Sequence, residues 1–104
     1  MRKFYSLLGL AKKAGKVAAG EDIAESTVRQ KNAFLLILAT DASANTKKKF
    51  HNAAAHHEVP IIEVGLKTEL GRAIGVEFRA ILAITEPGFA KKLLEIFENF
   101  SCEV

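Results

Sequence analysis

The chain has 104 residues, of which 49% are apolar and 26% are charged. A chain of this length supports one compact core, so we expect a single domain over residues 1–104, and the composition excludes an intrinsically disordered protein. The longest stretch without a polar side chain, residues 33–39, is far shorter than the roughly 20 residues that a helix needs to cross a bilayer. We therefore predict no transmembrane segment and no membrane partner.

The charges are distributed unevenly along the chain. Residues 1–52 hold ten of the fifteen Lys and Arg and four of the twelve acids, a net charge of +6, whereas the remainder is net −3. A basic half favours a polyanionic partner such as a nucleic acid. The alternative is that these lysines only solvate a surface.

The amino-terminal stretch resembles a secretory signal at first sight. Arg2 and Lys3 precede an apolar segment, but Lys12 and Lys13 cut that segment short, and no small-residue cleavage site comes before them. Cys102 is the only cysteine, which excludes an internal disulfide and a thiolate metal cluster. We therefore expect a cytoplasmic protein.

The first predicted elements are a helix, a short strand and a second helix. Apolar residues at helical spacing predict a helix over residues 3–14, which Gly15 ends. Residues 16–19 are typical of a short strand that leads into Gly20. The helix after Gly20 is expected to turn four residues toward the core: Ile23, Ala24, Thr27 and Val28.

A strand and a third helix follow. Residues 34–40 are continuously apolar, as expected for a strand buried on both faces. Residues 41–43 form a turn, and the next helix extends to about His57. Its expected inward residues are Phe50, Ala53 and Ala54.

The second half continues the alternation. Residues 60–64 and 79–85 are predicted strands, separated by a helix over 68–74 that Gly75 ends. Pro87 suits the first turn of a last helix because its fixed φ fits there and its missing N–H costs nothing. This order of elements predicts an α/β fold, a three-layer α/β/α sandwich. The last helix is expected to pack on the sheet through a stripe of Phe89, Leu93, Ile96, Phe97 and Phe100.

Tests for catalytic and ligand motifs fail. Five residues instead of four separate Gly9 from Gly15, and Val17 stands where a phosphate loop needs Ser or Thr. The glycines at 65, 71 and 75 do not have dinucleotide-binding spacing. The three histidines, at 51, 56 and 57, lack the helical spacing of a metal pair and are expected at the surface. We predict no enzyme activity, no cofactor and no metal.

One segment carries a functional signal. Residues 16–22, KVAAGED, place Gly20 where a strand becomes a helix, and Glu21 and Asp22 follow it. Free backbone N–H groups at a helix start attract phosphates or other acceptors, and glycine allows close approach. The alternative is that the two acids only complement the helix dipole.

A wider set of motifs reinforces this signal. The chain contains, in this order, LLGLAKKAGKVAAGEDIAE, ILATDAS, NTKKK, VP and LGRAIGVEFRAILAITEPGFAK, and the likeness covers about residues 4–94. The ensemble resembles the kink-turn RNA-binding family of ribosomal proteins, of the L-seven-Ae and L-thirty-e type, and in particular its short bacterial members. The resemblance implies a sandwich around a small mixed four-stranded sheet. It also implies a structured RNA as partner, an rRNA or mRNA kink-turn, with the ribosome as a possible setting and no role for DNA.

The resemblance also implies where RNA binds. The junction between the first strand and the second helix contacts the sheared base pairs, and a loop tip before the last strand packs on the kinked bases, while nearby lysines contact phosphates. Unpaired or sheared bases expose edges that an A-form groove hides. In this chain, the junction consists of Gly20, Glu21, Asp22, Ile23 and Ser26, the tip of Gly75, Val76, Glu77, Phe78 and Arg79, and the lysines are Lys12, Lys13 and Lys16.

The junction departs from the family pattern. Asp22, Ile23 and Ser26 stand where the RNA binders of the family often carry Asn, Glu and Lys, and Ala18 and Ala19 replace common lysines. Loss of amide and ammonium donors weakens readout of guanine O6 and N7.

The alternative function is a protein-interaction module on the same fold. At the tip, we expect at least one apolar side chain to face water, and the alternative is that Phe78 folds onto the sheet edge.

Overall fold

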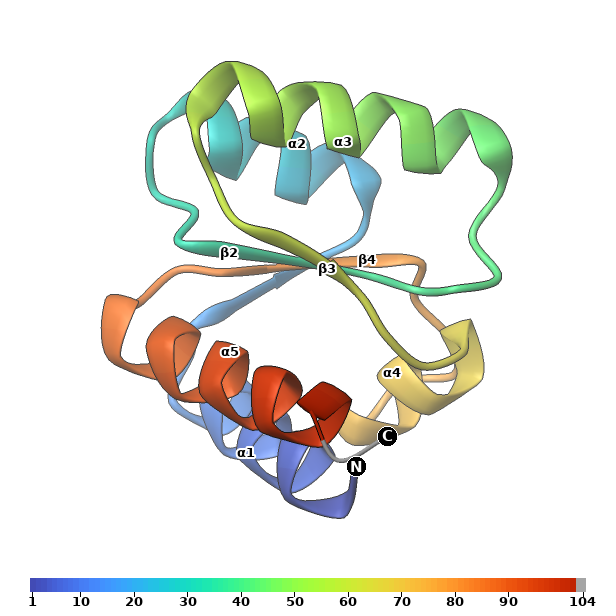
Figure 1. The fold of residues 1–104 in the computed structure, drawn as a ribbon. Coiled ribbons are helices and arrows are strands. Elements are labelled where there is room, and N and C mark those ends of the chain that lie inside the picture. The colour runs from blue at the N-terminus through green and yellow to red at the C-terminus, as the bar shows by residue number, and fades with distance from the viewer. Residues whose placement is uncertain (103–104) are drawn as a thin grey trace.

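A computed structural model describes residues 1–102 of the chain. Figure 1 shows three layers, in which α2 and α3 cover one face of the sheet and α1, α4 and α5 cover the other. The predicted α/β/α sandwich is therefore confirmed. The elements are α1 (Arg2–Lys13), β1 (Val17–Ala19), α2 (Glu21–Arg29), β2 (Leu35–Leu38), α3 (Ala44–His57), β3 (Ile61–Glu63), α4 (Lys67–Ala73), β4 (Ile81–Ile84) and α5 (Pro87–Cys102).

The sheet is mixed, with the strand order β1-β4-β2-β3. Strand β4 runs antiparallel to both β1 and β2, with Ala83 opposite Ala18 on one side and Leu36 on the other. Strand β3 runs parallel to β2, with Ile62 opposite Ile37. All residues of β2 and β4 are buried, as expected for strands covered on both faces.

The strand directions give the sheet two different ends. At the first, which we name the tip end, β1, β2 and β3 finish and β4 begins: the Gly20 N–H donates to the Ile81 carbonyl. At the opposite or far end, the Thr85 N–H donates to the Lys16 carbonyl. Helices α2, α3 and α4 each follow a strand that finishes at the tip end, so all three begin there.

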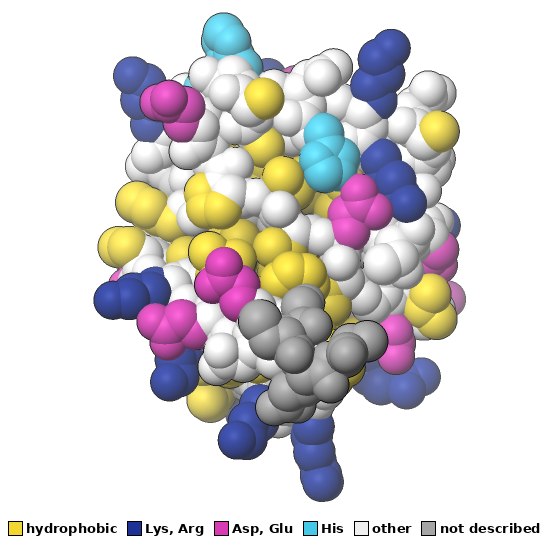
Figure 2. Space-filling view, viewed as in Figure 1, with side chains coloured by type: hydrophobic (Ala, Val, Ile, Leu, Met, Phe, Trp, Pro, Cys, Tyr) yellow, Lys and Arg dark blue, Asp and Glu magenta, His cyan; other side chains and the backbone are white. Residues whose placement is uncertain are grey.

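The core consists of apolar side chains between the layers. Phe4, Phe50 and Leu93 are fully buried, as the helical periodicity predicts. On the face that shows the β3 edge, apolar side chains lie between the two helical layers, and Lys and Arg side chains project from the rims (Figure 2). In the described part of the chain, no helix is long and apolar enough to cross a membrane.

Three predicted inward positions are wrong. Ile23 is 58% exposed because α2 faces the sheet through the small Ala24 and Val28. Phe100 is 46% exposed because α5, with 16 residues, is about 24 Å long and outruns the four-residue strand β4 beneath it. Phe34 is 40% exposed because it precedes the paired part of β2.

Two smaller corrections concern helix α1 and helix α5. Ala14 is exposed and forms the C-cap of α1, whereas Gly15 with φ +74° ends the helix as predicted. Phe97 is half-buried and packs against the core without being enclosed by it.

Candidate nucleic-acid interface

A hollow of about 480 Å³ lies at the tip end of the sheet. Four segments that are distant in sequence converge on it: the β1–α2 junction, the starts of α3 and α4, and the segment before β4. The hollow therefore joins the predicted junction to the predicted tip. Its lining residues are Ala19, Gly20, Glu21, Ser43, Thr46, Lys67, Phe78, Arg79, Ala80 and Ile81.

Helix α2 begins at this hollow, and no side chain among the described residues caps it. Its N-cap residue is Gly20, whose φ of +105° favours glycine and which has no side chain to accept the first N–H groups of the helix. Glu21 and Asp22 complement the positive end of the helix dipole and are both exposed. The helix thus presents backbone donors beside carboxylate acceptors.

The two other helices that begin here have internal partners for their first N–H groups. In α3, the Ser43 hydroxyl accepts from the Thr46 N–H at 3.1 Å. In α4, the Leu66 N–H donates to Glu69 Oε1 at 2.8 Å, and the Lys67 N–H donates to Asp41 Oδ1 at 2.8 Å. Among the described helix starts at this hollow, α2 is therefore the one with no side chain bonded to its first N–H groups.

The tip, residues 75–79, packs directly on helix α4. The Val76 N–H donates to the Gly71 carbonyl and the Arg79 N–H to the Lys67 carbonyl, so the segment folds back along α4. A Cβ at position 71 would lie 2.5 Å from the Phe78 Cα, so only glycine permits this close approach. The helix thus fixes the tip by backbone contact.

The side chains of the tip differ in exposure. Phe78 is 53% exposed, whereas Val76 is half-buried against the core. The expectation that at least one apolar side chain faces water is confirmed, and Phe78 is that residue. The Arg79 guanidinium donates to the Phe78 backbone carbonyl at 2.7 Å, and both residues line the hollow.

The lysines predicted to contact phosphates lie elsewhere. Lys16 is at the far end of β1, four residues from Gly20, a separation of about 13 Å along a strand. Lys12 and Lys13 are in the last turn of α1, and all three lysines are exposed. The structure therefore places these three residues outside the hollow, at the opposite end of the β1–β4 pair.

The hollow contains a lysine that the sequence analysis missed. Lys67 lines it from the first turn of α4, together with Ser43 and Thr46 from α3. The sequence does contain a pattern that indicates this position. Lys67 follows a strand and starts a helix, and in open α/β sheets ligands bind beyond the carboxyl ends of strands. Lys67 and Arg79 supply the cations of the hollow.

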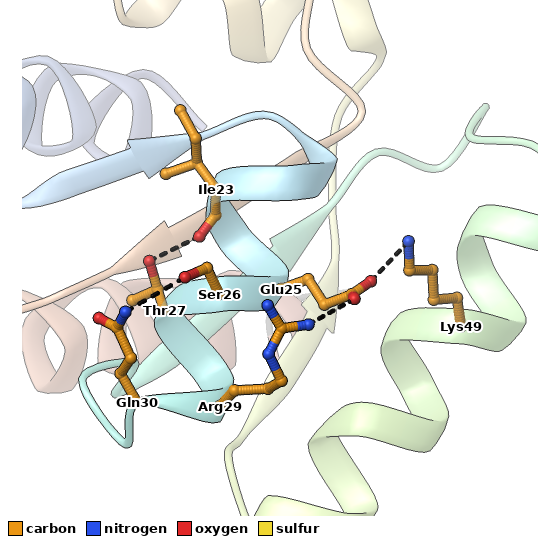
Figure 3. A network of polar contacts seen from close by, with 7 residues as sticks. All are labelled: Ile23, Glu25, Ser26, Thr27, Arg29, Gln30 and Lys49. Carbon is orange, nitrogen blue, oxygen red and sulfur yellow. Dashed lines mark hydrogen bonds and ion pairs between the residues drawn. The ribbon is translucent and has the colours of Figure 1, made fainter.

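The junction residues Ile23 and Ser26 lie on α2 and do not line the hollow (Figure 3). Ile23 is exposed, and the Ser26 hydroxyl accepts from the Gln30 amide at 3.3 Å. Glu25 contacts Arg29 at 2.8 Å and Lys49 of α3 at 2.6 Å. The hydrogen bond from Lys49 lowers the pKa of Glu25, and the same contact raises the pKa of Lys49.

Two of the three lysines at the start of α3 therefore have structural partners. Besides the Lys49–Glu25 pair, Lys47 contacts Glu63 of β3 at 3.3 Å, and His51 contacts the same carboxylate at 2.7 Å. These pairs tie α3 to α2 and to the sheet edge. Within residues 1–102, no group of three or more His, Cys, Asp or Glu side chains has the arrangement of a metal site.

Comparison with known proteins gives a consistent match. The model of the ribosomal protein L7Ae/L30e/S12e/Gadd45 family matches residues 2–94. A Bacillus subtilis (strain 168) protein named RNA-binding protein YlxQ is 41% identical over 96 residues, which is 92% of this chain and 96% of that protein. Its namesake from Enterococcus faecium is 38% identical over 98 residues, 94% of each chain.

Two solved structures share the fold. A protein of unknown function from Bacillus halodurans C superposes with a TM-score of 0.92 at 35% identity, over 94% of this chain and 99% of that one. A Giardia lamblia 15.5kD RNA binding protein superposes with a TM-score of 0.75 at 24% identity, over 96% of this chain and 86% of that one.

Proposed function

Because the chain belongs to the ribosomal protein L7Ae/L30e/S12e/Gadd45 family, we propose that it is a non-catalytic RNA-binding protein whose tip-end hollow receives a structured RNA. The bacterial relatives at 41% and 38% identity are both named RNA-binding proteins, which supports the proposal. The RNA is a kink-turn of rRNA or mRNA, and the protein acts in the cytoplasm in association with the ribosome.

One observation carries this proposal: the uncapped start of α2 and the exposed Phe78 line the same hollow. The N–H groups after Gly20 donate to phosphate or base acceptors, and the Glu21 and Asp22 carboxylates accept from guanine N1 and N2. The Phe78 ring stacks on an unpaired base, a contact worth roughly 1–3 kcal/mol. A kinked RNA offers exposed base edges and an unpaired base at one place, whereas a regular A-form duplex keeps its bases paired and stacked inside the helix.

The proposed site includes the junction, the tip and a more distant basic group. Ile23 and Ser26 flank the junction on α2, and Gly75, Val76 and Glu77 shape the tip. Lys67 and Arg79 contact phosphates at the hollow. Lys12, Lys13 and Lys16 contact phosphates of an RNA segment that continues past the far end of β1.

A second candidate is a protein-interaction module without kink-turn specificity. The exposed Ile23 favours it, because an aliphatic side chain at a binding surface suits an apolar partner better than a guanine edge.

A salt titration of RNA binding separates these functions. We expect the kink-turn RNA to bind at least tenfold, about 1.4 kcal/mol, more tightly than a plain duplex of equal length, and log affinity to fall linearly with log salt. Replacing Lys12, Lys13 and Lys16 with Gln is expected to reduce the slope by up to about 2–3 units on both RNAs. The matched control replaces the exposed Lys31, Lys48 and Lys91 with Gln. Equal affinity for kinked and plain RNA would remove kink-turn specificity, and no binding of either would favour the protein-interaction module.

A further inference from the structure

A groove of about 580 Å³ lies between the start of α1 and the end of α5, outside the hollow. The two helices pack side by side on the lower face of the sheet in Figure 1, and the start of the chain lies close to the end of α5. The groove is lined by Met1, Arg2, Lys3, Lys92, Ile96, Asn99 and Phe100.

The lining has a cationic rim and an apolar floor. Arg2, Lys3 and Lys92 are exposed, and no carboxylate is among the described residues that line the groove. Half-buried Ile96 forms part of the floor, and Phe100 is 46% exposed although its periodicity predicts a core position. Cations beside an exposed aromatic ring match the backbone and the bases of a single nucleic-acid strand.

One further cation, Arg72, lies between this groove and the hollow. Helix α4 begins in the hollow at Lys67, and its exposed Arg72 lies beside Tyr5 of α1. Helix α1 begins at the groove and packs against α4. A strand that leaves the hollow along α4 therefore passes Arg72, with the Glu69 carboxylate beside it, before it reaches Lys3.

We propose that this groove binds a single-stranded RNA segment that flanks the structured element in the hollow. Phe100 stacks on a base of that segment, and Arg2, Lys3 and Lys92 contact its phosphates. A duplex does not fit this description, because its paired bases are not available for stacking on a side chain. The inference rests on the proposed function, since the hollow supplies the first contact with the same RNA.

The test compares three RNAs: a blunt kink-turn, the same RNA with a tail of about eight uridines, and the same RNA with an abasic tail of equal length. The groove variant is Lys3→Gln with Lys92→Gln. The matched control is Lys31→Gln with Lys48→Gln, which removes the same charge from exposed lysines on the other helical layer. Circular dichroism verifies that both variants fold.

We expect the uridine tail to strengthen binding by the unaltered protein about tenfold. The groove variant loses this gain, binds the blunt RNA within about twofold of the unaltered protein, and has a salt slope on the tailed RNA that is smaller by about 1.4. The control variant keeps the gain. Phe100→Leu loses the part of the gain that depends on bases, so its affinities for the uridine and abasic tails become equal.

Two results would overturn the inference: a tail that adds nothing to binding by the unaltered protein, or a control variant that loses as much of the gain as the groove variant. Failure of the proposed function is a separate result, in which the blunt RNA does not bind. In that case the free uridine oligonucleotide is titrated instead of the tailed RNA. If the unaltered protein binds it and the groove variant does not, the result supports the proposed groove. If the unaltered protein does not bind it, the inference is overturned.

Discussion

The two ends of the sheet begin their helices in different ways. At the tip end, α2 starts at Gly20, and no side chain in the described structure caps it. At the far end, α5 starts at Pro87, and the Glu86 carboxylate accepts from the N–H groups of Gly88 at 2.6 Å and Phe89 at 3.0 Å. The first N–H groups of α5 thus have an acceptor within the protein, whereas those of α2 are open to a ligand.

The composition of the two ends does not reveal this difference. Each end carries an exposed phenylalanine, Phe78 at the tip end and Phe34 at the far end, beside exposed or half-buried cations. The helix directions separate them, because α2, α3 and α4 begin at the tip end, whereas α2 and α3 finish at the far end. Helix starts attract anions and helix ends repel them, so the tip end is the one suited to a polyanion.

Gly71→Ala is expected to have the largest effect. The new Cβ would lie 2.5 Å from the Phe78 Cα, so the tip must move away from α4. We expect the free energy of unfolding to fall by about 1–3 kcal/mol. Affinity for a kink-turn RNA falls more than tenfold, which is over about 1.4 kcal/mol. Denaturant unfolding and RNA titration measure the two effects.

Gly88→Ala at the far end is the control for this change. Its Cβ would meet the Glu86 carboxylate 2.8 Å away, a flexible side chain remote from the hollow. We expect unchanged RNA affinity. Normal RNA binding by the Gly71 variant would mean that the position of the tip does not matter for recognition.

Phe78→Ser and Phe34→Ser compare the two exposed rings directly. Phe78 is 53% exposed, so its removal should leave the melting temperature nearly unchanged, while loss of stacking lowers RNA affinity about tenfold. Phe34→Ser should leave RNA affinity unchanged. Replacing Val76 as well is less informative, because Val76 is half-buried and its loss also destabilises the fold. Equal losses from the two single variants would mean that bases stack on both phenylalanines, so base stacking would not be confined to the tip end.

Much of the fold was predictable because local sequence determines it. The continuous apolar runs around β2 and β4 indicate strands covered on both faces, and both strands are fully buried. Gly15 ends α1, and Pro87 opens α5. The inward faces were less predictable: periodicity shows which side of a helix is apolar, but it does not show how far the sheet extends beneath it. Phe100 lies on the part of α5 that extends past the sheet, and it is therefore exposed.

The candidate site was only partly predictable because it depends on strand order. Gly20 and Phe78 are far apart in sequence, and the pairing of β1 with β4 brings them to one hollow. Lys16 is close to Gly20 in sequence, but β1 carries the chain to the other end of the sheet. Lys67 enters the hollow because β3 runs parallel to β2 and so finishes at the same end as β1. The sequence shows that Lys67 follows a strand and starts a helix, but it does not show the strand order that brings Lys67 to Gly20 and Phe78.

The smallest expected effect concerns the capped helix start at the far end. Hydrogen bonds from the backbone N–H groups of Phe89 and Gly88 lower the pKa of Glu86. A carboxyl group with a lowered pKa in the folded state contributes stability above its unfolded pKa, about 4.3 for Glu, and loses this contribution as the pH falls through its folded value. Glu86→Ala should therefore lower the melting temperature slightly at pH 7, and the difference from the unaltered protein should shrink below about pH 4.

The kink-turn affinity of the Glu86→Ala variant tests whether the capped start of α5 takes part in RNA binding. If the far-end cap serves only the fold, Glu86→Ala does not weaken kink-turn binding at pH 7 although the protein is less stable. Lys16 lies near Glu86, and the coulombic attraction between them also lowers the carboxyl pKa. Removing the carboxylate frees Lys16 from this partner, so stronger RNA binding by the variant would indicate that RNA reaches Lys16 at the far end. Weaker binding would mean that the capped start of α5 takes part in RNA recognition, so the uncapped start of α2 would not be the one helix start that binds RNA.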